Sequence, residues 1–146
     1  MAEFQNLIQE KDLEKHSIFL GFVPPWKIPS IIKLSTCVVV PEREFPIQHH
    51  MPILPKEVMA VGKCLILSEE LYSKRCYGNL IDGENVFLVD PREVKEFRRI
   101  IEKVISQPDI ALKIGQNAYK YSIKSENFDK YIDFTLDLYT SLINKP

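Results

Sequence analysis

Side chains able to take part in chemistry are concentrated in residues 41–60. This segment holds two adjacent histidines, three glutamates, an arginine and a lysine: His49, His50, Glu42, Glu44, Glu57, Arg43 and Lys56. Four of the ten prolines in the chain fall between residues 41 and 55, which restricts the backbone there. The segment therefore has the residue types and the rigidity that a ligand site needs.

The position of this segment favours an anionic ligand. It follows residues 37–40, a β-branched apolar run that predicts a strand, and it leads into a helix expected over residues 52–61. In open parallel sheets, ligands bind beyond the carboxyl ends of the strands, and a helix that begins there offers unpaired N–H groups to an anion. The spacing predicts a pocket without naming its substrate.

Structural explanations compete with the functional ones. Glu57 near a helix start can simply complement the helix dipole, a gain of under about 1 kcal/mol at the surface. His49 and His50 can be solvated loop residues, and adjacent histidines seldom both ligate one metal, so we predict no metal site. Arg43 and Lys56 can be exposed charges. The sequence contains no P-loop and no G-x-G-x-x-G motif.

Alternating helix and strand patterns surround the segment. Short apolar runs predict four strands, at residues 17–20, 37–40, 63–67 and 86–89. Each follows a helical pattern, at residues 3–14, 26–34, 52–61 and 69–75. Beyond these, three helices are predicted from about residue 91 to a stop at Pro108, at 109–124 and at 126–144. Strands that are apolar on both sides predict an α/β fold with a parallel sheet between helices.

The composition limits the class of protein. At 146 residues and 17.0 kDa the chain has the size of a single domain. Its 45% hydrophobic residues lie in runs too short to span a membrane, and its 19 basic against 20 acidic side chains predict no nucleic-acid partner. Three cysteines, Cys37, Cys64 and Cys76, predict free thiols in a reducing compartment. With no export signal seen, we expect a cytoplasmic protein.

Four stretches of sequence occur in an order that resembles one known family. They are IFLGFV at residues 18–23, CVVVP at 37–41, PILPKEVMAVGK at 52–63 with LILS at 65–68, and LIDGENVFLVDP at 80–91. This succession resembles the carboxyl-terminal, nucleotide-sugar-binding half of retaining GT-B glycosyltransferases of the group 1, or family 4, type. The resemblance covers about residues 7–124 and implies a Rossmann-like three-layer domain with a parallel sheet and carboxyl-terminal helices. Residues 126–146 resemble the family's terminal helix, which packs back toward the amino-terminal domain.

The resemblance also implies roles for individual residues. Glu57 stands where the family has the glutamate that holds the donor ribose, and a carboxylate can accept from two hydroxyls at once. Val58 and its neighbours would offer backbone N–H groups to the donor diphosphate. Gly21 and Phe22 belong to a turn that resembles the wall beside the nucleobase. Glu44 is the candidate for the catalytic-site glutamate beside the donor sugar.

The segment departs from the family pattern around the first glutamate. Twelve residues separate Glu44 from Glu57 where the family has seven, and no glycine follows Glu44. Glu42, His49 or His50 can therefore take the place of Glu44. Further candidates for contact with the substrate are Lys56, His49 and His50.

Length is the largest departure. The family's enzymes have two Rossmann-like domains, whereas residues 1–146 correspond to one partial second domain without its opening strands. The resemblance implies the donor-binding part of an enzyme that transfers a hexose from a nucleotide diphosphate sugar to a glycan, lipid or small acceptor. We expect it to be inactive without an amino-terminal acceptor-binding domain or subunit, and to use no cofactor.

Two other functions stay open. A catalytically inactive Rossmann-like interaction module would dock a partner, or a second copy of itself as a homodimer, through an exposed apolar sheet edge. An unrelated Rossmann-like domain would bind another phosphate compound.

Overall fold

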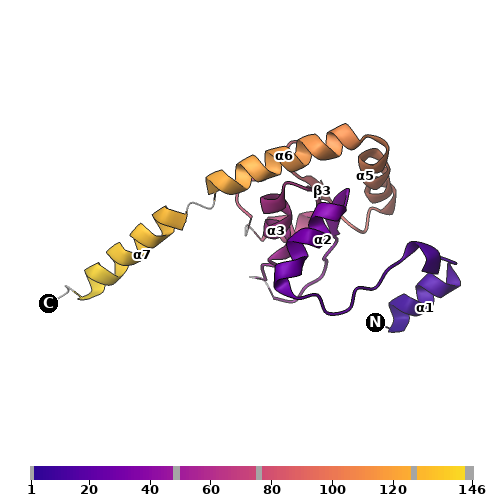
Figure 1. The fold of residues 1–146 in the computed structure, drawn as a ribbon, viewed down its shortest axis with the longest axis horizontal. Helices are drawn as coiled ribbons and strands as arrows, with labels where there is room; N and C mark the ends of the chain where they lie inside the picture. The colour runs from indigo at the N-terminus through magenta and orange to yellow at the C-terminus, as the bar shows by residue number, and fades with distance from the viewer. Residues whose placement is uncertain (1, 48–49, 75–76, 126–127, 144–146) are drawn as a thin grey trace.

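The structure is an α/β fold built on a parallel sheet (Figure 1). The computed structural model describes residues 2–47, 50–74, 77–125 and 128–143. Strands β1 (Cys37–Val40), β2 (Cys64–Ser68) and β3 (Phe87–Val89) lie in the order β1-β2-β3, with Val38 opposite Leu65. The predicted parallel sheet and Rossmann-like layering are confirmed, with three strands among the described residues instead of four.

Helices cover both faces of the sheet. They are α1 (Ala2–Glu10), α2 (Ile28–Leu34), α3 (Leu54–Val61), α4 (Glu69–Ser73), α5 (Val94–Ser106), α6 (Pro108–Ser125) and α7 (Phe128–Ile143), with short 3₁₀ turns at Glu14–His16 and Pro25–Lys27. One core joins the sheet to α2 and α3, and a second core joins the opposite face to α5. Helix α6 contributes Ala118 to the first core and Ile114 to the second, so it closes both.

The central strand explains why the sheet could be recognised in the sequence. All five residues of β2 are buried. Leu65 and Leu67 belong to the core beneath α3, whereas Cys64 and Ile66 belong to the core beneath α5. Successive side chains of a strand point to opposite faces, so a strand covered on both faces is a continuous apolar run.

The strand predicted at residues 17–20 is wrong. This run is irregular backbone and its apolar side chains are exposed, with Ile18 at 86% and Leu20 at 57% of their full accessibility. An apolar run becomes a strand only where a neighbouring strand satisfies its backbone N–H and C=O groups. Residues 17–20 pair with no strand in the part of the chain that the structure describes.

The last helix, α7, extends away from the sheet and the other helices (Figure 1). Its large apolar side chains, including Phe134 and Tyr139, are exposed. The packing of this helix against an amino-terminal domain stays a prediction, because such a domain is not among the described residues. Among the helices described, none is both long and apolar enough to cross a membrane.

A buried thiol in the sheet gives a first testable prediction. Cys64 lies opposite Cys37 on the neighbouring strand, and both thiols are free. Burial, with a smaller contribution from the charge of Cys37, raises the pKa of Cys64 from 9.0 to about 12. We expect the folded chain to protect Cys64 from a thiol reagent at pH 8, since the thiolate is the reacting form. Mass spectrometry of the Cys64 peptide would measure the labelling rate. A folded chain labelled as fast as the chain unfolded in urea would contradict this.

The same shift predicts a loss of stability in alkali. The unfolded chain releases the Cys64 proton near pH 9, whereas the folded chain holds it to about pH 12. The stabilising contribution is therefore complete below pH 9 and is lost as the pH rises from 9 toward 12. A smaller loss of stability in a Cys64→Ala variant over this range, measured by urea unfolding, would support the assignment.

Candidate functional site

The candidate site lies where the three strands end. The segments that follow Val40, Ser68 and Val89, two loops and helix α4, carry charged residues to the same edge of the sheet. They surround a cavity of about 280 Å³ lined by Arg43, Glu69, Glu70, Ser73, Asp90, Pro91 and Arg92. This is the edge at which open parallel sheets bind their ligands.

The loop after β1 is held by a carboxylate from α4, the short helix that directly follows β2. The backbone N–H of Glu44 donates to Glu70 Oε2 at 2.6 Å, and that of Phe45 donates to Glu70 Oε1 at 3.2 Å. Glu44 itself has φ of +55°, in the left-handed region. The hydrogen bond from the Glu44 amide, with those from Phe45 and Lys74, lowers the pKa of Glu70.

Glu70 is placed by the start of a short helix. Ser68, the last residue of β2, is buried and its hydroxyl accepts from the Leu71 amide at 3.2 Å. A serine that caps a helix in this way sets the direction of the first turn. Glu70 and Lys74 are then one turn apart, with Lys74 Nζ 3.5 Å from Glu70 Oε1.

A second set of contacts joins the same loop to His50. Glu42 Oε2 lies 3.1 Å from His50 Nε2, and the imidazole stacks on the Phe45 ring with 4.0 Å between centroids. Lys74 Nζ lies 3.8 Å from Glu42 Oε1 and 5.4 Å from the centre of the Phe45 ring. The candidate residues Glu42, Glu44 and His50 are thus brought together in one network with Lys74.

The two arginines of the cavity differ in their pairing. Arg92 binds Asp90 through Nε and Nη2, with its Nη2 at 2.7 Å from Asp90 Oδ2. This pairing lowers the pKa of Asp90 and raises that of Arg92. Arg43 forms no hydrogen bond or ion pair with a described residue, although its charge acts on Asp90. Arg43 is therefore the cavity cation that a bound anion can engage without breaking an existing pair.

The helix start at α3 differs in detail from the expectation. The amides of Lys56 and Glu57 both donate to the carbonyl of Ile53, at 2.9 and 3.2 Å. Val58 is the fifth residue of the helix, where an amide bonds to the carbonyl four residues earlier, and its side chain is fully buried. The amides at the very start of the helix, those of Ile53 and Leu54, precede the helical bonding pattern.

Glu57 keeps an available carboxylate. Its side chain is half-buried in the first turn of α3 and forms no hydrogen bond or ion pair with a described residue. Lys56 beside it is half-buried and has its own interactions. Neither residue lines the cavity that Arg43 and Asp90 form, so the predicted ribose contact and the cavity are separate features of one edge.

Two other candidates, Gly21 and Phe22, fall outside this arrangement. Gly21 has φ of +62° with open space around it, and Phe22 is 88% exposed. Neither lines the cavity at the strand ends. His49 lies outside the described residues. The role of these three residues at a nucleobase or sugar stays a prediction.

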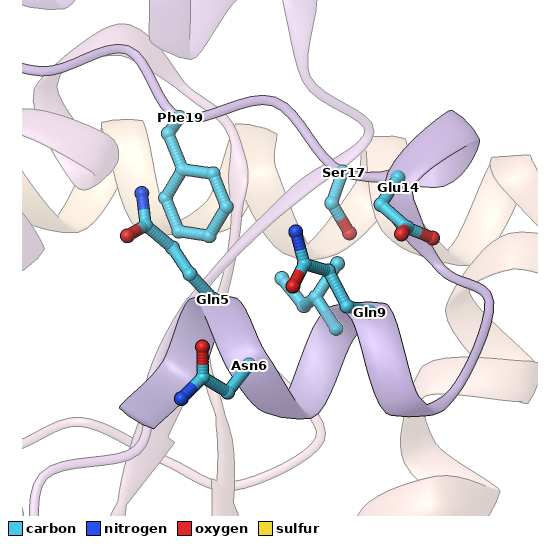
Figure 2. Close-up of a pocket in the computed structure, with 7 residues that line it drawn as sticks. Gln5, Asn6, Gln9, Glu14, Ser17 and Phe19 are labelled. Carbon is cyan, nitrogen blue, oxygen red and sulfur yellow. The ribbon is translucent and has the colours of Figure 1, made fainter. Parts of the chain in front are cut away.

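A second hollow lies at the amino-terminal end of the chain. It has a volume of about 410 Å³ and is lined by Gln5, Asn6, Ile8, Gln9, Glu14, Ser17 and Phe19. Figure 2 shows the side chains of Gln5 and Gln9 rising from α1 toward Phe19 and Ser17. None of the candidate residues of the 41–60 segment takes part in it.

Sequence reasoning missed Glu70, Asp90 and Arg92. Each follows a predicted strand within three residues, and that position at the carboxyl edge is the signal that could have found them. Charged residues after strands are common, so the signal becomes specific only when the order of the strands is known.

The fold is that of a Rossmann-like α/β domain, with a cavity lined by charged residues at the ends of its parallel strands. The family model described as glycosyl transferases group 1 matches residues 1–121. This chain belongs to that family. A comparison with curated proteins and a comparison with solved structures each gave no match.

Proposed function

We propose that this chain is the donor-binding part of a glycosyltransferase that takes a hexose from a nucleotide diphosphate sugar. The observation that supports this most strongly is the family match over residues 1–121, within which the charged edge of the sheet lies. The acceptor in this proposal is a glycan, a lipid or a small molecule.

The proposed roles follow from which polar groups can still form hydrogen bonds or ion pairs with a ligand. The Glu57 carboxylate accepts from the two ribose hydroxyls, because it has no competing partner among the described residues. The amides of Ile53 and Leu54 replace that of Val58 as the helix groups that face the diphosphate. Arg43 adds a positive charge, and Glu44 lies beside the hexose.

The charge balance of the cavity supports a need for another domain or subunit. Three carboxylates line it, those of Glu69, Glu70 and Asp90, against two arginines, of which Arg92 is already paired. A departing diphosphate needs positive charge aimed at it, and a missing donor of this kind costs about 3 kcal/mol or more in the transition state. We therefore propose that this chain binds the donor and that an amino-terminal acceptor-binding domain or subunit completes catalysis.

The proposal is tested by mapping where a nucleotide binds. Amide resonances of the ¹⁵N-labelled chain would be followed during titration with UDP, GDP, ADP and their hexose conjugates. Shifts centred on residues 43–45, 53–57 and 90–92 support the proposal. Shifts confined to the opposite edge of the sheet, around Thr36 and Lys63, would contradict it.

A second candidate function, an interaction module, is favoured by the exposed apolar residues near the amino terminus. They are Phe4, Leu7, Leu13, Ile18, Leu20, Phe22 and Trp26. Contiguous exposed apolar surface is typical of protein contact sites, and β1 is an edge strand of the described sheet. This function predicts a homodimer or larger assembly by light scattering at micromolar concentration. A strict monomer would count against self-association.

A further inference from the structure

The backbone at Glu44 has a conformation that needs external support. Its φ of +55° is disfavoured for a residue with a Cβ, and glycine is the residue that adopts it freely. Within the loop after β1, this residue turns the chain between Glu42 and Phe45. Contacts from outside the loop must therefore select this conformation over the extended alternatives.

The contact that selects it comes from one carboxylate. The two oxygens of Glu70 accept separately from the consecutive amides of Glu44 and Phe45, at 2.6 and 3.2 Å. Charge-assisted bonds of this kind are stronger than neutral ones, and two of them from one rigid group fix an orientation. An alanine at position 70 removes both acceptors at once.

Lys74 holds the carboxylate in place. Its side chain is 9% exposed, and its Nζ lies between Glu70 Oε1 at 3.5 Å and Glu42 Oε1 at 3.8 Å. Both ends of the loop segment that carries Glu44 are therefore tied to the same short helix region. Glu70 itself lines the cavity at the strand ends.

We propose that Glu70, held by Lys74, is a positioning residue that fixes Glu44 for contact with the donor. This inference rests on the proposed function, since it assigns to Glu70 the placement of a residue in the proposed donor site. Glu70 acts through the backbone of Glu44 and Phe45.

The test compares Glu70→Ala and Glu70→Gln with wild type, using Glu102→Ala as a matched control. Glu102 is an exposed glutamate on α5 that pairs with Arg98. In the ¹⁵N spectrum, Glu70→Ala should move the Glu44 and Phe45 amide protons upfield, whereas Glu70→Gln should restore part of that shift with its single acceptor oxygen. Unmoved Glu44 and Phe45 resonances in Glu70→Ala would overturn the proposal even if no donor were present.

Affinity for the nucleotide sugar provides the second readout. Glu70→Ala should weaken binding by about tenfold, and Glu44→Ala added to it should weaken binding little further, because both changes remove the same contact. Full binding by Glu70→Ala would overturn the positioning role and leave the proposed function standing. Wild-type chain that binds none of the nucleotide sugars would overturn the proposed function and this role with it. The isosteric Glu70→Gln keeps the test valid if Glu70→Ala fails to fold.

Discussion

A chain carrying Glu57→Ala is expected to bind its nucleotide sugar roughly 100-fold more weakly, a loss of about 3 kcal/mol. The side chain of Glu57 is half-buried in the first turn of α3 and forms no hydrogen bond or ion pair with a described residue. Its carboxylate oxygens can therefore accept hydrogen bonds from a ligand. Two hydroxyls bound to a carboxylate contribute about 1.5–3 kcal/mol each. Isothermal titration calorimetry measures the difference.

Two variants make this result specific. Glu57→Gln keeps one acceptor oxygen and should fall between wild type and Glu57→Ala. Glu102→Ala removes an exposed glutamate of α5 and should bind as wild type does. Circular dichroism should show unchanged helix content in all three. Equal affinities for wild type and Glu57→Ala would leave Glu57 as a helix-dipole residue alone.

Gly115→Ala is expected to destabilise the fold by about 2 kcal/mol. A Cβ at this position would collide with the carbonyl oxygen of Gly62, and it would lie 2.9 Å from the Gly62 carbonyl carbon and 3.0 Å from that of Lys63. These are backbone atoms at the end of α3, so they cannot move aside as a flexible side chain does. Overpacking costs about 1–3 kcal/mol or more, which exceeds the gain of about 1 kcal/mol from replacing glycine in a helix.

Urea unfolding would measure this effect, with Gln116→Ala as the control on the same helix. Gln116 is exposed beside Gly115, so its replacement should change stability by less than about 0.5 kcal/mol. A Gly115→Ala chain more stable than wild type would show that helix propensity outweighs the contact between α6 and α3. The packing of these two helices would then be looser than the structure has it.

The local pattern of apolar residues predicted those helices and strands whose side chains are buried in cores formed by the chain itself. The apolar run at Cys64–Ser68 and the helical stripe of α5 both face cores that the described residues complete. The turn that precedes β3 is held by Asn85, whose Oδ1 accepts from the Ile81 amide at 2.8 Å. Residues 17–20 have the same apolar pattern as a strand, yet no strand among the described residues pairs with them, and their backbone is irregular.

The candidate site was predicted in its position and only partly in its members. Residues 41–60 do contribute Glu42, Arg43, Glu44 and His50 to the edge of the sheet. Glu70 and Asp90 reach the same edge because β2 lies between β1 and β3 in one parallel sheet, an arrangement set by the packing of strands far apart in sequence. Pairing between such residues leaves no local pattern to read.

The central claim, that this chain binds a nucleotide sugar at the carboxyl edge of its sheet, is tested most directly by calorimetry. The purified chain would be titrated with UDP, GDP and ADP and with their hexose conjugates. We expect saturable binding selective for one base, tighter for the sugar conjugate than for the free nucleotide, and roughly 100-fold weaker in Glu57→Ala. Absence of binding to every ligand at millimolar concentration would contradict it.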